Sequence, residues 1–130
     1  MIAIDTSALM AIVGREAFAQ ACIGVLDADS DIVMAAATVT EALIVSGRRN
    51  VGAVMTRLLD SLPLRVEPVT EAFARRAAAA YAQWGRGVHP AALNFGDCFA
   101  YAVAKQYNCP LLYVGNDFAK TDIASALPAP

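Results

Sequence analysis

The sequence predicts an α/β protein in which a central parallel sheet of four to five strands carries helices on both faces. Short, continuously apolar segments recur along the chain, as expected of strands that are buried on both faces. Between them lie stretches of helical periodicity, most of them long enough for two helices, and helical connections make successive strands parallel. With 130 residues and 58% apolar side chains, the chain fits one domain over residues 1–130.

The expected elements form a strand followed by two helices, three times over, and then a fourth strand and a short fifth. Strands are expected at 2–4, 32–35, 64–69, 111–114 and 123–127, and helices at 8–13, 16–26, 38–48, 51–62, 70–84 and 98–107. The strands are apolar runs or alternate apolar with polar residues, while the helices carry apolar residues at spacings of three and four. The proline-rich tail 128–130 is expected to fray.

Local signals mark the ends of several elements. Thr6 or Ser7 can cap the first helix, because a hydroxyl oxygen accepts the free N–H groups of a first turn. Thr38-x-x-Glu41 fits the capping box, in which the glutamate accepts the N–H of the cap residue. Pro68 confines the third strand to an edge or to a strand end, since it lacks an N–H for the ladder.

The composition excludes several classes of function. The only histidine is His89, so neither a histidine-based zinc site nor a Ser-His-Asp relay is expected, and any catalysis must use carboxylates. Three cysteines without C-x-x-C spacing are expected as buried free thiols: Cys22, Cys98 and Cys109. No apolar run is long enough to cross a membrane and no leader segment is visible, so we expect a cytoplasmic protein.

Basic residues are few but include arginines that could contact phosphates. The net charge of −2 argues against a protein that coats nucleic acid through many phosphate contacts. Arg48 and Arg49 form a pair that fits either a phosphate contact or a solvated helix face. The loop 85–90 contains Arg86 and His89, and it fits either a mobile loop on the substrate side or a plain connector.

Four acids follow a strand or lie near the start of a helix: Asp5, Glu41, Asp97 and Asp117. Each position alone is explained by helix capping or by the helix dipole. Right-handed crossovers, however, bring the carboxyl ends of all parallel strands to one edge of the sheet, where the four acids would become neighbours. Carboxylates without histidine or thiolate favour Mg²⁺ or Mn²⁺, which can activate water and orient a phosphodiester. The spacing leaves capping and a metal site both open.

Four segments in this order resemble the PIN-domain toxins of the VapC type. They are Ile4-Asp5-Thr6-Ser7-Ala8, Thr40-Glu41-Ala42, Leu93-Asn94-Phe95-Gly96-Asp97-Cys98, and Gly115-Asn116-Asp117-Phe118 continuing to Thr121-Asp122-Ile123. The resemblance covers nearly the whole chain. It implies an Mg²⁺- or Mn²⁺-dependent endoribonuclease that hydrolyses RNA, is usually dimeric, and is neutralised by a VapB-type antitoxin.

The resemblance also assigns roles to residues of this chain. Asp5, Glu41, Asp97 and Asp117 match the acidic quartet that binds metal and activates water. Thr6 or Ser7 matches a hydroxyl position that would hold the first aspartate. Asn116 matches a supporting position beside the fourth acid. Asp122 matches a recurrent acid whose role stays open. RNA contacts are expected from the variable basic residues, namely Arg48, Arg49, Arg86 and His89.

Two other functions compete with this interpretation. An aspartyl-phosphate phosphohydrolase would use Asp5 as its nucleophile, but the second aspartate expected two residues later is replaced by Ser7. A non-catalytic module that binds RNA or protein is the other alternative. Apolar helix residues either pack in the core or stay exposed for a partner, with the antitoxin expected in a helical groove beside the acids; they include Leu9, Met10, Leu58 and Leu59.

Overall fold

The computed structural model describes residues 1–128 and contains one parallel sheet with the strand order β3-β2-β1-β4. The strands are β1 (Ile2–Ile4), β2 (Ile32–Ala35), β3 (Leu64–Glu67) and β4 (Leu111–Leu112). β1 lies inside the sheet, because Ala3 pairs with Val33 of β2 on one side and with Leu111 of β4 on the other. The predicted parallel sheet is confirmed, and its first strand is central.

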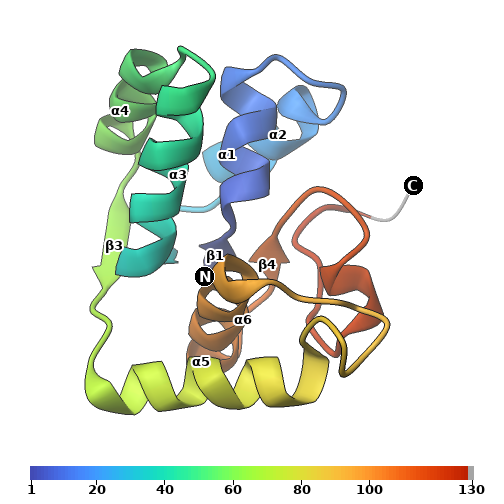
Figure 1. Ribbon diagram of the computed structural model, residues 1–130. Helices are drawn as coiled ribbons and strands as arrows, with labels where there is room; N and C mark the ends of the chain where they lie inside the picture. Colours follow the sequence, from blue (N-terminus) through green and yellow to red (C-terminus); the bar gives the residue numbers. More distant parts are fainter. Residues whose placement is uncertain (129–130) are drawn as a thin grey trace.

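Helices cover both faces of this sheet (Figure 1). They are α1 (Thr6–Val13), α2 (Ala19–Ala28), α3 (Ala36–Arg48), α4 (Gly52–Ser61), α5 (Glu71–Trp84), α6 (Phe95–Tyr107) and the short 3₁₀ helix η1 (Phe118–Lys120). None of the helices within residues 1–128 is long and apolar enough to cross a membrane.

Alternating strand residues divide the core into two clusters. Ala3 and Val33 pack with α5 and α6 on one face, whereas Ile4 and Met34 pack with α1 to α4 on the other. This division follows from the two-residue period of a strand, which sends successive side chains to opposite faces. Leu9 and Met10 are buried in the second cluster, with Leu58 and Leu59 packed against it, so these four residues belong to the core. The cysteines are free, and Cys22 and Cys98 are buried as predicted.

The start of α3 differs from the prediction. The helix begins at Ala36, directly behind β2, with Ala35 as its cap residue and no side-chain capping bond. Thr38 therefore lies within the helix, where its side chain is buried and its hydroxyl oxygen has no hydrogen-bond partner. The predicted Thr38–Glu41 capping box is wrong, because the strand runs into the helix without a loop that Thr38 could end. Glu41 is thereby free to serve another purpose.

Two further ends of elements differ as well. Asp5, not Thr6 or Ser7, caps α1, since its carboxylate accepts the N–H of Ser7. The fifth strand predicted at 123–127 is reduced, within the part of the chain that the structure describes, to an isolated bridge between Leu111 and Ser125. A turn in which Leu127 N–H donates to Ser125 Oγ ends the pairing there. Of the tail predicted to fray, residues 129 and 130 lie outside the described residues.

Candidate active site

The four acids come from four different segments that meet at the carboxyl edge of the sheet. Asp5 directly follows β1, Glu41 lies in the second turn of α3, Asp97 lies in the first turn of α6, and Asp117 follows β4 and precedes η1. The charges of Asp5, Glu41 and Asp117 all raise the pKa of Asp97, so the four carboxylates are close enough to interact. The fold therefore turns four separate sequence positions into one acidic cluster.

Asp5 is the most buried of these acids, with 4% of its surface exposed. Its Oδ2 accepts hydrogen bonds from the backbone N–H of Ser7 at 3.0 Å and from the Ser7 hydroxyl at 2.6 Å. Its Oδ1 is buried without a hydrogen-bond partner. Burial raises the pKa of Asp5 to about 6 in spite of these bonds, and the charge of Glu41 acts in the same direction.

Glu41 is held by a residue 35 positions earlier in the chain. The Thr6 hydroxyl donates to Glu41 Oε1 at 2.6 Å, so the neighbouring residues Thr6 and Ser7 each hold a different acid. The other side of the Glu41 carboxylate rests against the backbone of α6 at Gly96. A Cβ at Gly96 would lie 2.8 Å from Glu41 Cδ and closer still to Oε2, so any larger residue would require the Glu41 carboxylate to move from this position.

Asp97 combines a capping role with an unusual pKa. It is the third residue of α6 and forms a capping box with Asn94: Asp97 N–H donates to Asn94 Oδ1 at 2.9 Å, and Asn94 N–H donates to Asp97 Oδ2 at 3.0 Å. Burial is the main cause that raises the pKa of Asp97 to about 7, and the charges of the other three acids contribute. Capping and membership of the acidic cluster therefore coexist in one residue.

Asp117 differs from the other three because it is exposed and makes no capping bond to η1. Its loop is held by contacts elsewhere. The N–H of Val114, at the start of this loop, donates to the Ser7 hydroxyl oxygen at 3.0 Å. Ser7 therefore connects the first acid with the segment that carries the fourth. Asn116, beside Asp117, is also exposed.

The cluster has the chemistry of a magnesium or manganese site but is open. Its donors are all carboxylate oxygens, and Asp5 Oδ1 is a buried acceptor that no protein group satisfies, which is a position that suits a cation. Within residues 1–128, however, no three acidic, histidine or cysteine side chains already surround a common point as a formed metal site. Residues that fit such a cation are present, but their side chains would have to turn towards it.

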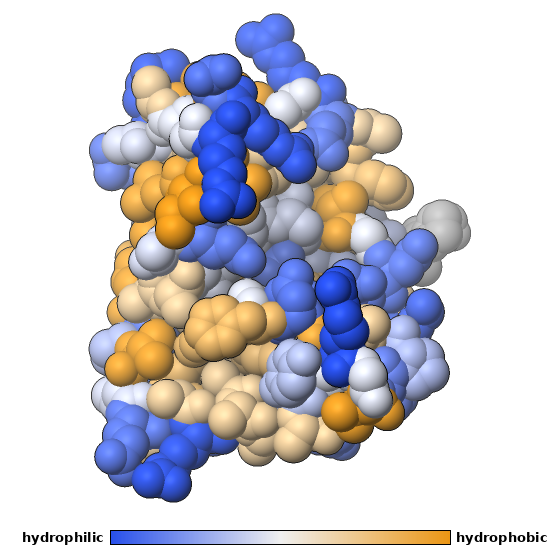
Figure 2. Space-filling model, viewed as in Figure 1, coloured by the Kyte–Doolittle hydropathy of each residue, from blue (hydrophilic) through white to orange (hydrophobic). Residues whose placement is uncertain are grey.

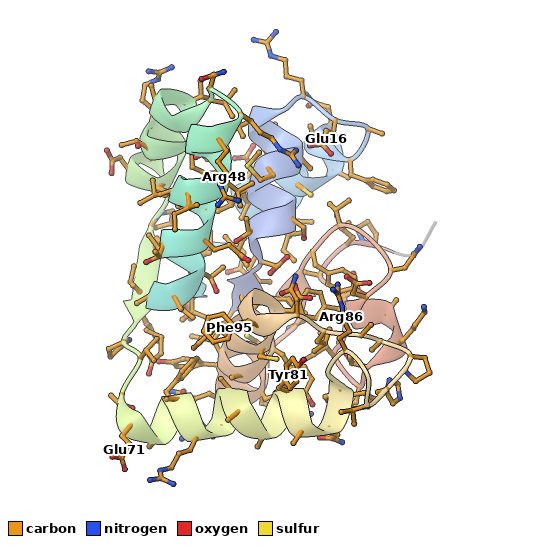
Figure 3. The ribbon with its side chains drawn as sticks, in the orientation of Figure 1. Glu16, Arg48, Glu71, Tyr81, Arg86 and Phe95 are labelled. Carbon is orange, nitrogen blue, oxygen red and sulfur yellow. The ribbon has the colours of Figure 1, made fainter. Side chains whose placement is uncertain are left out.

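The basic residues predicted to contact RNA lie in separate places. Arg48 and Arg49 are exposed at the end of α3, seven and eight residues beyond Glu41, and Arg86 is exposed in the loop after α5. Figure 3 shows Arg48 on the upper part of α3 and Arg86 in the lower half, near Phe95 and Tyr81. His89 packs edge-on against Trp84, and its Nδ1 accepts the N–H of Ala91, so His89 holds its own loop together.

Three parts of this arrangement were not foreseen from the sequence. Gly96 had no predicted role, although a glycine can mark a place where another group approaches the backbone closely. It was also not foreseen that Thr6 binds Glu41 while Ser7 binds Asp5, because the sequence suggested either hydroxyl as the support of the first aspartate. The Asn94–Asp97 pair could have been found as a capping box in Asn-x-x-Asp form.

Comparison with known proteins identifies relatives over almost the full length. A family model described as the PIN domain matches residues 2–124. Ribonuclease VapC28 of Mycobacterium tuberculosis is 42% identical over 128 residues, which covers 95% of this chain and 96% of the relative. Ribonuclease VapC42 of the same species is 41% identical over 127 residues, which covers 95% and 97% of the two chains.

Solved structures share the fold at much lower sequence identity. The crystal structure of Mycobacterium tuberculosis VapC20, described as a toxin that cleaves the sarcin-ricin loop, superposes with a TM-score of 0.80 at 17% identity and covers 98% of this chain and 100% of that one. A toxin–antitoxin complex from Klebsiella pneumoniae gives a TM-score of 0.73 at 14% identity, with 99% and 100% covered. At these identities the structural matches support the fold.

Proposed function

We propose, from the premise that this chain belongs to the PIN-domain family and within it to the VapC ribonucleases, that it is an Mg²⁺- or Mn²⁺-dependent endoribonuclease. The observation that carries this proposal is the buried, unpartnered Oδ1 of Asp5 within a cluster of four acids. We further propose that the protein acts in the cytoplasm as the toxin of a toxin–antitoxin pair.

Each acid has a proposed task in this reaction. Asp5 and Asp97 would hold the cation, with Glu41 and Asp117 completing the ligand set. Bound there, Mg²⁺ or Mn²⁺ would supply activation of water and neutralisation of the charge on the leaving oxygen. Ser7, Thr6 and Asn94 each hydrogen-bond one oxygen of a different carboxylate, which limits how far three of the four acids must turn to reach the cation.

The test is cleavage of RNA by the purified protein with added Mg²⁺ or Mn²⁺. We expect cleavage that EDTA abolishes and that Asp5→Asn reduces by roughly 100-fold or more, because this change removes a charged ligand but keeps the side-chain shape. Asp60→Asn is the matched control, since Asp60 is exposed on α4. Unchanged cleavage by the Asp5→Asn protein, or equal loss in the control, would contradict the proposal.

Arg86 is the residue that we propose as the main RNA contact. It is exposed and lines the same apolar groove as Asn94, the partner of Asp97. A phosphate beside the acids would therefore lie within reach of this loop, whereas Arg48 and Arg49 would contact more distant phosphates. Arg86→Ala is expected to raise KM several-fold and to weaken the salt dependence of binding, because one phosphate contact is lost. An unaltered KM would remove Arg86 from the RNA surface.

The antitoxin is proposed to occupy the groove between α5 and α6. This groove has a volume of about 720 Å³ and apolar walls, and Phe95 at its rim is 77% exposed. Tyr81 and Phe95 lie close together on the visible face (Figure 3), which is largely apolar around them in Figure 2. A helical or extended antitoxin segment seated there would also block access to Asp97. Phe95→Glu is expected to abolish capture of the cognate antitoxin while leaving the fold intact.

A second copy of the chain is proposed to contact the apolar face of α3. Leu43 and Ile44 are adjacent in this helix and are 41% and 51% exposed. A two-fold contact would bury the same patch on both copies. Light scattering should give the mass of a dimer for the natural protein and of a monomer for Ile44→Asp. A natural protein that stays monomeric at high concentration would refute this part, without affecting the nuclease proposal.

A further inference from the structure

We propose that Asp122 is a positioning residue that fixes the loop carrying Asp117 against α6, and thereby sets the affinity of the acidic cluster for its cation. This inference rests on the proposed metal-dependent nuclease function and extends it to a residue outside the cluster. Asp122 lies five residues beyond Asp117 and points to a different set of partners.

Both carboxylate oxygens of Asp122 are engaged by α6. The Tyr101 hydroxyl donates to Oδ1 at 2.7 Å, and the Lys105 ammonium donates to Oδ2 at 2.8 Å. Tyr101 is itself buried and accepts the indole N–H of Trp84 at 3.0 Å. The contacts form a chain from the last turn of α5, through α6, to the segment after η1. Because both oxygens of Asp122 are already bound by α6, we assign it a positioning role and not that of a fifth ligand.

The loop between β4 and Asp122 is attached at both ends. At its start, Val114 N–H donates to the hydroxyl of Ser7, which in turn donates to Asp5. At its end, Thr121 closes the turn, because its hydroxyl donates to the carbonyl of Phe118 at 2.7 Å. Phe118 is buried against Tyr113. We call the contacts of Asp122 with Tyr101 and Lys105 the clamp. The clamp joins this closed turn to α6, the helix whose first turn carries Asp97.

Asp117 depends on these attachments because it is exposed and makes no capping bond to η1. Its distance from Asp97 is therefore determined by the backbone of the loop. Tyr101 and Asp97 lie on the same helix, one turn apart, so the clamp ties the fourth acid to the third through a rigid element. Loss of the clamp should let Asp117 move relative to Asp97 and weaken the hold of the site on a cation.

A contact on the same helix offers a matched control. Glu67, the last residue of β3, accepts hydrogen bonds from Tyr107 and Gln106 in the last turn of α6. The contact between Tyr107 and Glu67 has the same chemistry as the contact between Tyr101 and Asp122. It holds β3, however, and not the loop that carries Asp117. Glu67→Gln should therefore have little effect on cation binding, whereas Asp122→Asn should have a large one.

The experiment measures Mn²⁺ binding by isothermal titration calorimetry and, separately, the Mn²⁺ concentration that gives half-maximal RNA cleavage. For Asp122→Asn and Lys105→Met we expect both quantities to show an affinity about tenfold weaker, the size typical of residues that orient metal ligands. The cleavage rate at saturating Mn²⁺ should stay within about twofold of the natural protein, because the ligands themselves are present. Asp117→Asn should instead lose rate at every Mn²⁺ concentration.

Stability distinguishes positioning from a general structural role. Lys105 and Asp122 are about half exposed, so their pair adds little to stability, and Tm of the Lys105→Met protein should stay within about 5 °C. Tyr101→Phe removes the other half of the clamp and should weaken Mn²⁺ binding in the same direction. Natural affinity in the Asp122→Asn and Lys105→Met proteins would overturn the inference. Absence of Mn²⁺ binding or cleavage by the natural protein would instead overturn the proposed function.

Discussion

Replacing Asp97 with asparagine is expected to abolish cleavage and, at the same time, to stabilise the metal-free fold at neutral pH. The pKa of Asp97 is raised from its ordinary value of 3.8 to about 7, mainly by burial and further by three neighbouring acids. The folded state therefore binds this proton more tightly than the unfolded state does. Stability falls as the pH rises from about 4 to about 7, where Asp97 must become charged beside other charges.

The magnitude follows from the difference between the two pKa values. At about 1.4 kcal/mol per pH unit, ionisation of Asp97 lowers the stability of the fold by about 4 kcal/mol above pH 7. Asparagine avoids this, and its side-chain oxygen can still accept the N–H of Asn94. The gain is reduced because Asp97 is partly exposed and because a negative charge at the start of α6 contributes about 0.3–1 kcal/mol through the helix dipole. We expect a net gain of about 1–3 kcal/mol.

The assay is thermal or urea unfolding in EDTA at several pH values. The Asp97→Asn protein should exceed the natural protein in Tm by about 5–10 °C at pH 7.5, and the difference should shrink towards zero near pH 4. Added Mn²⁺ should stabilise the natural protein alone, because only it binds the cation. Asp60→Asn, an exposed change on α4, should have no effect. A less stable Asp97→Asn protein, or a difference that does not depend on pH, would refute the reasoning.

Three other substitutions test the site and the core. Gly96→Ala should displace the Glu41 carboxylate and lower the cleavage rate at least tenfold, as roughly expected when a ligand is misplaced, and an unaffected rate would show that Glu41 can adapt. Ser7→Ala removes the hydroxyl shared by Asp5 and Val114, so Mn²⁺ affinity measured by calorimetry should fall by roughly 10- to 100-fold. Met34→Ala should lower the free energy of unfolding in urea by about 2–5 kcal/mol, since Met34 is fully buried in β2.

The fold could be predicted because its signals are local. Apolar runs bounded by turn residues located β1, β2 and β4, and helical spacing located the six helices to within a few residues. Prediction failed where a local signal competed with a tertiary one. The Thr38–Glu41 motif has the spacing of a capping box, but β2 continues directly into α3, and Glu41 is bound by Thr6 instead. The segment 123–127 has the composition of a strand but meets β4, which is only two residues long.

The acidic cluster was predicted in outline because parallel strands end at a common edge. Its details required the structure, since the partners of each acid are set by packing over long separations. The Ser7 hydroxyl accepts the backbone N–H of Val114, which lies 107 positions later in the chain. No local sequence pattern predicts a contact over such a separation. The burial of Asp5 Oδ1 and the approach of Gly96 to Glu41 likewise depend on how α3 and α6 sit against β1.

The adjacent hydroxyls at the start of α1 make the rotation of that helix a determinant of the site. Thr6 and Ser7 are about 100° apart around the helix axis, and each faces a different acid. Exchanging the two residues would not preserve the arrangement, because the threonine methyl group would then occupy the space beside Asp5 and Val114. A rotation of α1 by one residue would release Asp5 and Glu41 together, even if its apolar residues found new core contacts. The packing of Leu9 and Met10 in the core fixes the rotation of α1, and it thereby helps to fix the orientation of Asp5 and Glu41.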